Sequence, residues 1–240
     1  MAKPESKPAA EGEPVESEAV EPILRGDRDP YRFGHGRKLE LRPGTSGWSA
    51  EDLHDPDVRC LYDNGRYEIV NGVLQEMPAS FYAGGMVADR LSDIVVFKLR
   101  SEGIPYSTSN EADIQIQPDR IRRLDKVIVV GNDLAKFRAL QFERGPQDWH
   151  RQNLIIPPTV GIESISQGHE RRDRVEKRRE YAAFGIPNYW IVDYFTRRLD
   201  ILTLDGTDYR DEAVGTDDDV LKPACFPGLE VNLTELWGDG

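Results

Sequence analysis

Cysteine and histidine are scarce in this sequence, which has two cysteines and four histidines in 240 residues. Cys60 and Cys225 lack metal-ligand spacing, so we expect buried or half-buried thiols and not a disulfide or a metal site. His35, His54 and His150 have no ligand spacing between them either, which disfavours a zinc site. This thiol usage fits a reducing, cytoplasmic location.

Long apolar runs are also missing. No apolar stretch is long enough to span a bilayer, and residues 1–22 have no apolar core of a secretory signal. We therefore expect neither a transmembrane helix nor a membrane partner.

Basic charge is in the minority. Lysine and arginine number 31 against 43 aspartates and glutamates, a net charge of −12. This balance argues against a protein held on nucleic acid by bulk electrostatics. The charge is uneven, because residues 1–22 carry six glutamates and two lysines whereas residues 120–126 and 171–179 are locally basic. A basic face on an acidic protein therefore stays open.

The hydrophobic pattern divides the chain into a tail and one domain. Residues 1–43 are rich in Pro, Glu, Ala and Gly and have no hydrophobic period, so we predict a disordered acidic tail and linker. Residues 44–240 are long enough for one sizeable domain. Within it, residues 131–157 form a long polar connection, which predicts an insertion or lid with a helix of its own.

Periodicity within this domain predicts an α/β (α+β) fold. Ser49 is a plausible N-cap, Asn71-Gly72 is a hairpin turn, and residues 84–101 have one apolar helical face. A second helix over roughly 169–184 ends before Gly185 and Pro187. The expected strands are EADIQIQP (111–118), DKVIVVG (125–131), TVGIESIS (159–166), NYWIVDY (188–194) and RRLDILTLD (197–205), and FPGLEVNLTEL (226–236) is expected to hold one last short strand and a turn. Together they predict a mixed sheet with one strong strand–helix–strand unit.

One glutamate lies inside an apolar strand. Glu163 is flanked by isoleucines and a valine, so its carboxylate must be paired, protonated or bound to a cation. Asp125 opens another apolar run, and two carboxylates on neighbouring strands can hold a hard divalent cation. Such an ion can polarise a phosphoryl oxygen and lower the pKa of a water molecule. Lys177 is the cation available to stabilise charge on an attacked phosphate.

The following helix carries Asp173, Lys177 and Tyr181 at positions i, i+4 and i+8, on one stripe. If this stripe faces the sheet, Lys177 reaches Glu163. Another interpretation is also open at this point. Acids near strand ends are common, and an acid-before-base pair with Tyr181 as a core anchor is typical of an ordinary surface helix.

The order E-x-x-S, D-x-x-x-K-x-x-x-Y and G-[IV]-P-x-Y-W-[IV]-V-D resembles the Uma-two family of restriction-endonuclease-like proteins. YEIVNGVLQEMPAS resembles that family's opening hairpin and FPGLEVNLTEL resembles its close, so the resemblance covers about residues 47–240. Its most specific block runs through Glu163, Ser166, Asp173, Lys177, Tyr181, Gly185, Ile186, Pro187, Tyr189, Trp190, Ile191, Val192 and Asp193.

This resemblance implies the PD-(D/E)XK nuclease fold, with a restriction-endonuclease-like central mixed β-sheet flanked by helices, and endonuclease action on DNA. Asp125 and Glu163 match the metal-binding carboxylates, which implies Mg²⁺ (or Mn²⁺). Lys177 matches the family's own lysine, in place of the one otherwise expected at Ile165. The backbone carbonyl of Ile165 and the carboxylate of Glu68 are further metal-ligand candidates. A homodimer is the expectation for a double-strand cutter.

Some positions depart from the family pattern. Leu124 stands where a proline usually precedes the first aspartate, and Asn71-Gly72-Val73 replaces an Asp-Gly-Glu turn. Ala83 and Gly84 stand where a Glu–His pair is common, and we interpret Pro118-Asp119 as a turn and not as the motif. The missing acids leave open a catalytically inactive nuclease-fold module that binds nucleic acid or protein. Cleavage of RNA or of a structured junction is a third alternative.

Overall fold

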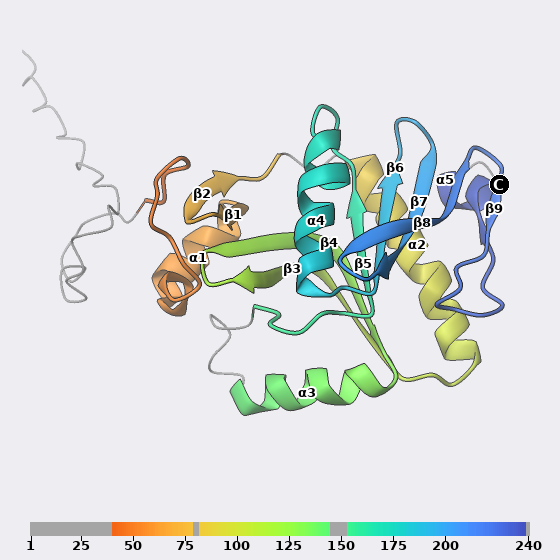
Figure 1. The fold of residues 1–240 in the computed structure, drawn as a ribbon, viewed down its shortest axis with the longest axis horizontal. Coiled ribbons are helices and arrows are strands. Elements are labelled where there is room, and N and C mark those ends of the chain that lie inside the picture. Colours follow the sequence, from red (N-terminus) through yellow and green to blue (C-terminus); the bar gives the residue numbers. More distant parts are fainter. Residues whose placement is uncertain (1–39, 79–81, 145–152, 239–240) are drawn as a thin grey trace, which may run out of the picture.

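The structure is a computed structural model that describes residues 40–78, 82–144 and 153–238. The predicted acidic tail lies almost wholly outside these residues, so it stays a prediction, as does the domain boundary at residue 44. Figure 1 shows one large sheet with helices packed around it. The predicted α+β class with a central mixed sheet is thereby confirmed.

The described elements are helices and strands interspersed along the chain. The helical segments are η1 (Asp52–His54), α1 (Pro56–Asn64), α2 (Tyr82–Ser101), α3 (Asn132–Arg144), η3 (Arg172–Lys177), α4 (Arg178–Phe184) and α5 (Leu233–Trp237). The strands are β1 (Tyr67–Val70), β2 (Val73–Glu76), β3 (Tyr106–Gln117), β4 (Arg120–Val130), β5 (Val160–Ser164), β6 (Asn188–Asp193), β7 (Arg198–Asp205), β8 (Asp208–Thr216), β9 (Val220–Leu221) and β10 (Val231–Asn232).

The main sheet runs in the order β2-β1-β4-β5-β6-β7-β8, and β3 pairs with β4. β5 and β6 are parallel, whereas the other neighbouring pairs are antiparallel. Every residue of β6 is buried, because both faces of this strand are covered. Tyr189 and Ile191 pack in one core, and Trp190 and Val192 pack in the other.

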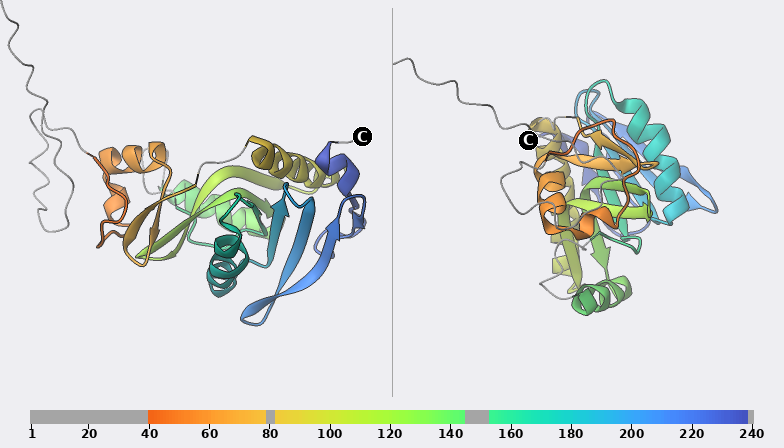
Figure 2. Two further views of the ribbon diagram at one scale, coloured as in Figure 1. Left: turned by 90° about the horizontal axis from the view of Figure 1, so that it is seen from above. Right: turned by 90° about the vertical axis from the view of Figure 1, so that its left-hand side faces the viewer.

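Two apolar cores lie on the two faces of the sheet. α2 and α5 cover one face, where Leu91 packs in the same cluster as Trp190 and Leu236. α3 and α4 cover the other, where Phe137 and Tyr181 join one cluster. Figure 2 shows α2 and α5 on one side of the strands and α4 on the other. Because both faces of the sheet are packed with apolar side chains, we expect a functional site where polar side chains lie between a helix and the sheet.

Several local predictions are confirmed. Asn71 and Gly72 have φ of 53° and 73°, the left-handed pair that a type I′ hairpin turn between β1 and β2 requires. Gly185 caps α4 with φ of 91°. Pro118-Asp119 is the turn between β3 and β4. The helix expected within residues 131–157 is α3, while residues 145–152 lie outside the described residues.

Other predictions were wrong in detail. Asp125 does not open a strand, because β4 already begins at Arg120. The helix expected over 169–184 begins with a π-helical turn, η3, and continues as α4. The segment FPGLEVNLTEL ends in helix α5, which Asn232 caps through its side chain, after a strand of only two residues. Neither α1 nor β8 was expected.

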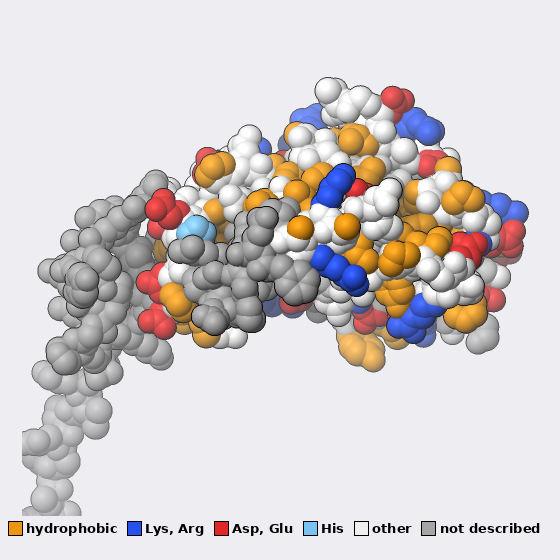
Figure 3. All heavy atoms as spheres, turned by 90° about the horizontal axis from the view of Figure 1, so that it is seen from below, with side chains coloured by type: hydrophobic (Ala, Val, Ile, Leu, Met, Phe, Trp, Pro, Cys, Tyr) orange, Lys and Arg blue, Asp and Glu red, His pale blue; other side chains and the backbone are white. Residues whose placement is uncertain are grey.

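The locally basic stretch over residues 120–126 does not form a basic surface. Arg122 and Arg123 are 1% and 3% exposed and are ion-paired inside the protein. On the face that Figure 3 shows, lysines and arginines lie scattered among acidic, apolar and neutral groups. None of the described helices combines the length and the apolar character needed to cross a membrane.

Candidate active site

The site forms where one edge of β4 changes partners. β3 pairs with β4 along its whole length, so β1 and β5 must share the other edge of β4. β1 pairs with that edge at Ile121 and β5 pairs with it from Lys126 onward. Among the described strands, none pairs with residues 122–125 on this side, and carboxylate side chains take the place of backbone acceptors.

Glu68 from β1 and Asp125 from β4 fill this gap. Glu68 Oε1 accepts a hydrogen bond from the backbone N–H of Arg123 at 3.0 Å. Asp125 Oδ2 accepts one from the backbone N–H of Ser164 at 2.7 Å. Because backbone donors hold both carboxylates, their positions are set by the sheet.

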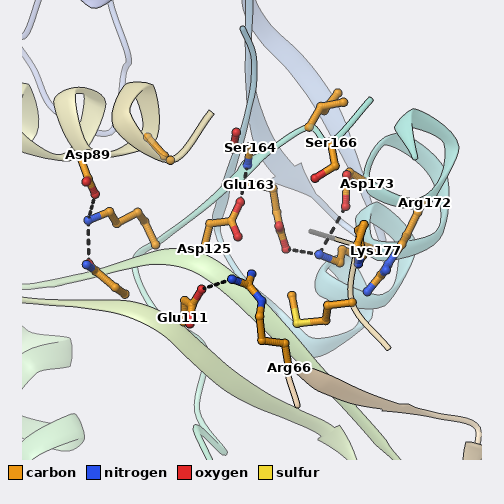
Figure 4. Close-up of a pocket in the computed structure, with 17 residues that line it drawn as sticks. Arg66, Asp89, Glu111, Asp125, Glu163, Ser164, Ser166, Arg172, Asp173 and Lys177 are labelled. Carbon is orange, nitrogen blue, oxygen red and sulfur yellow. Dashed lines mark hydrogen bonds and ion pairs between the residues drawn. The ribbon is translucent and has the colours of Figure 1, made fainter. Parts of the chain in front are cut away.

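A cavity of about 410 Å³ opens beside this gap, lined by side chains of α2, β3, β4, β5 and η3. Figure 4 shows Asp125, Glu163 and Lys177 converging on it. Ile165 also lines the cavity, whereas Glu68 does not. The structure therefore brings together four of the five residues predicted for the site. None of the described residues of 131–157, the predicted insertion or lid, lines it.

Glu163 is buried and its carboxylate is hydrogen-bonded, as expected for an acid inside an apolar strand. Its Oε1 accepts from Lys177 Nζ at 2.7 Å and from the hydroxyl of Tyr181 at 2.8 Å. Tyr189 packs edge-on against Tyr181, with ring centroids 5.2 Å apart. The stripe of Asp173, Lys177 and Tyr181 thus faces the sheet, and the ordinary surface helix is excluded.

The π-helical turn η3 aims two cations at these carboxylates. Arg172 and Lys177 are five residues apart, and in a π-helix residues i and i+5 follow one another on one side. Both reach Glu68: Arg172 donates to its Oε2, and Lys177 Nζ lies 3.8 Å from its Oε1. Asp173 Oδ1 lies 3.3 Å from Lys177 Nζ. Arg172, in the locally basic segment 171–179, therefore belongs to the cavity.

Negative charge is in surplus around the cavity. Burial, together with the charges of Asp125 and Asp173, raises the pKa of Glu163 well above its ordinary value against the opposing effect of Lys177. Burial likewise raises the pKa of Asp125. Burial alone would lower the pKa of Lys177, but Glu163 and Asp173 outweigh it and raise that pKa. One ammonium group faces three carboxylates here, an arrangement that a further cation would stabilise.

Glu68 has its charge balanced by the protein itself. It is fully buried, and its Oε2 accepts from Arg122 Nη1 at 2.9 Å and from Arg172. Burial alone would raise its pKa, but Lys177, Arg172 and Arg122 outweigh burial and lower the pKa to about 2. Glu68 therefore holds Arg172 and Lys177 in position through its buried carboxylate.

Glu68→Gln should remove an acid-sensitive part of the stability. A carboxyl whose pKa falls from 4.5 to about 2 on folding contributes about 3 kcal/mol above the unfolded pKa. This contribution is lost as the pH falls from 4.5 toward 2. We expect the variant to be less stable than the parent at neutral pH, with the difference shrinking across this window. Urea denaturation at several pH values measures this difference. The exposed Glu76→Gln is the control, and a constant difference across the window would contradict the assignment.

Asp125 and Glu163 have the features of a divalent-cation site. In the described part of the chain, hydrogen-bond donors reach Oδ2 of Asp125 and Oε1 of Glu163, which leaves one oxygen of each carboxylate for a cation. No three of the described His, Cys, Asp and Glu side chains converge as a complete metal site. Mg²⁺ is commonly held by one or two carboxylates and keeps several waters, so these residues fit Mg²⁺ or Mn²⁺.

Sequence reasoning missed two other cavity residues, Arg66 and Glu111. Both have left-handed backbones, with φ of 52° and 48°, and their side chains pair over the cavity. The preceding Asp63-Asn64-Gly65 is a typical turn sequence and could have placed a turn there. Nothing in the residue types reveals the direction in which Arg66 leaves that turn.

Comparison with known proteins supports a nuclease. A family model, Uma2, described as "Putative restriction endonuclease", matches residues 51–234. The chain belongs to the Uma2 family. Among solved structures, the Uma2 chain is similar to a "putative nuclease belonging to DUF820" from Anabaena variabilis, at 12% sequence identity and a TM-score of 0.55. That match covers 72% of this chain and 90% of the other, and it shows the shared fold. No curated protein matches.

One departure of this Uma2 chain from the family pattern has a steric explanation. A Cβ atom at Gly84 would lie 2.4 Å from Ser164 Oγ, so the first turn of α2 packs closely on β5 and a side chain there would displace the Ser164 hydroxyl. Gly85, the next residue, lines the cavity and has open space around it. The Glu–His pair is therefore replaced by close helix–strand packing and not by another polar group.

Proposed function

We propose that this Uma2 chain is a divalent-metal-dependent endonuclease that hydrolyses DNA phosphodiester bonds. The observation that carries this proposal is the convergence of Asp125 and Glu163, far apart in sequence, on one cavity with Lys177 hydrogen-bonded to Glu163 at 2.7 Å. A nuclease family and a nuclease-like fold agree with it.

Asp125 and Glu163 would hold Mg²⁺ or Mn²⁺, with the backbone carbonyl of Ile165 as a further ligand. When bound, such an ion supplies Lewis-acid stabilisation of the phosphodiester and lowers the pKa of water. Tyr181 and Lys177 both donate to Oε1 of Glu163. They fix the carboxylate and would leave its other oxygen available to a cation.

Lys177 would stabilise the charge that develops on the phosphate. Its raised pKa keeps the ammonium group protonated, and it lines the cavity at 2.7 Å from Glu163 and 3.3 Å from Asp173. A preorganised cation in a site of low solvent access is worth more than the same cation in water. We assign Glu68 to positioning Lys177 and not to the metal, because protein cations already balance its charge.

Supercoiled plasmid DNA tests the proposal. We expect nicking in Mg²⁺ or Mn²⁺, its loss on chelation, and its return when the ion is restored. Calorimetric titration of the chain with Mn²⁺ should show binding at millimolar concentrations or below. Neither binding nor nicking would instead identify a non-cleaving nuclease-fold module. Cleavage of labelled RNA with intact DNA would correct the substrate.

Two further expectations accompany this proposal. A homodimer would supply the second active site that cutting both strands requires. Cys60 and Cys225, both free thiols in the structure, fit a reducing cytoplasmic setting.

A further inference from the structure

Arg66 and Glu111 share an unusual backbone conformation. Their φ values of 52° and 48° lie in the left-handed region, which residues other than glycine, asparagine and aspartate rarely adopt. Such conformations cluster at functional sites. Both residues line the cavity, and Arg66 Nη1 lies 3.2 Å from Glu111 Oε1 (Figure 4).

This pair lies next to the proposed catalytic carboxylates. Asn110 pairs with Lys126 and Ala112 with Leu124, so Glu111 stands in register with Asp125 across β3 and β4. The guanidinium of Arg66, paired with Glu111, is therefore held one strand away from Asp125 at the same cavity.

The pair is loosely held. The side chains of Arg66 and Glu111 are 35% and 48% exposed, and half-exposed ion pairs contribute little stability. Arg172, in contrast, is tied to the fully buried Glu68. A phosphodiester offers arginine a charged, bidentate acceptor, so it can compete with the carboxylate of Glu111 for the guanidinium.

Building on the proposed nuclease function, we propose that Arg66 is a phosphate-binding residue of the site and that Glu111 occupies it until a DNA backbone displaces Glu111. Glu111 and the DNA then compete for one guanidinium. Removing Arg66 must weaken DNA binding, whereas removing the charge of Glu111 must strengthen it.

Fluorescence anisotropy with a short labelled duplex, in chelator and at several salt concentrations, tests this competition without cleavage. Arg66→Asn suits a left-handed backbone and should weaken binding roughly tenfold. It should also reduce the slope of log affinity against log salt by about one. Glu111→Gln should tighten binding roughly threefold. In the Arg66→Asn background, Glu111→Gln should gain nothing, because the competition is gone.

Matched controls lie elsewhere on the surface. Arg210→Asn removes an exposed arginine near Asp205, and Glu230→Gln removes the charge of an exposed glutamate paired with Lys222. Both should bind like the parent, and thermal unfolding should show every variant folded. Should Arg66→Asn unfold, Arg66→Lys serves instead and should weaken binding while keeping the salt slope.

Three results would overturn the inference: parental affinity in the Arg66 variants, an equal gain from Glu111→Gln with and without Arg66, or a parent chain that does not bind the duplex. The plasmid assay judges the nuclease separately, since it reads cleavage and not affinity.

Discussion

Asp125→Asn is expected to reduce Mg²⁺-dependent DNA cleavage roughly 10³-fold while leaving the fold intact. The amide oxygen can still accept the N–H of Ser164, so the contact between β4 and β5 persists. The charge that would hold the cation is gone. Plasmid nicking rates, followed over time in Mg²⁺, measure the effect.

Thermal unfolding separates this loss of activity from a loss of fold. Burial raises the pKa of Asp125, so its charge is unfavourable in the metal-free protein, and Asp125→Asn should melt at the parental temperature or above. Mn²⁺ should raise the melting temperature of the parent but not of the variant. Asp205→Asn, at the exposed end of β7, is the control for both measurements. An Asp125→Asn protein that cuts DNA as fast as the parent ends the metal-site assignment.

Asp113→Ala is expected to destabilise the protein by about 3–5 kcal/mol, because it removes the buried one of the two carboxylates that Arg59 and Arg123 share and leaves them the partly exposed Asp63 as the other. Asp113 Oδ1 accepts from Arg123 Nε at 2.7 Å, and Oδ2 accepts from Arg59. Burial raises the pKa of Asp113, and these two arginines oppose that rise. For a chain of this size, the melting temperature should fall by roughly 10 °C.

This cluster joins α1 to the sheet, since Arg59 belongs to α1 and Asp113 and Arg123 belong to β3 and β4. Asp208→Ala is the matched control, because Asp208 pairs with Arg178 on the surface, where its side chain is 66% exposed. We expect that control to change the melting temperature little. Equal shifts for the two variants would show that the buried pairs add no stability beyond surface ones.

Much of the site could be predicted because local patterns determine it. Glu163 in an apolar strand requires a partner, and the helical spacing of Lys177 and Tyr181 supplies two, which the structure shows at 2.7 and 2.8 Å. Asn71-Gly72 fixes its own turn, because both residues tolerate a left-handed backbone. Such features depend on neighbours in the chain and are visible in the sequence.

Features that depend on distant pairing could not be predicted in this way. Arg122 and Arg123 look like a basic surface stretch, yet both are buried in ion pairs, Arg122 with Glu68, which lies 54 residues earlier in β1, and Arg123 with Asp113 on the neighbouring strand β3. In the sequence, Asp125 stands at the start of an apolar run because arginines precede it, whereas in the structure Arg122 and Arg123 are buried by ion pairs within the first half of β4. The left-handed backbone of Glu111 has no signal in the sequence, because β3 continues on both sides of it and the residue is neither glycine nor asparagine.

The π-helical turn also makes the site sensitive to the length of the chain. Successive residues of a helix point in different directions around its axis, so each residue between Arg172 and Lys177 helps to set the direction in which the ammonium group leaves the backbone. Shortening this turn by one residue would swing Lys177 away from Glu163 while every side chain of the site remained present. The D-x-x-x-K spacing is thus a geometric requirement as well as a chemical one, and a Uma2 chain with the right residues at the wrong interval would lack the assembled site.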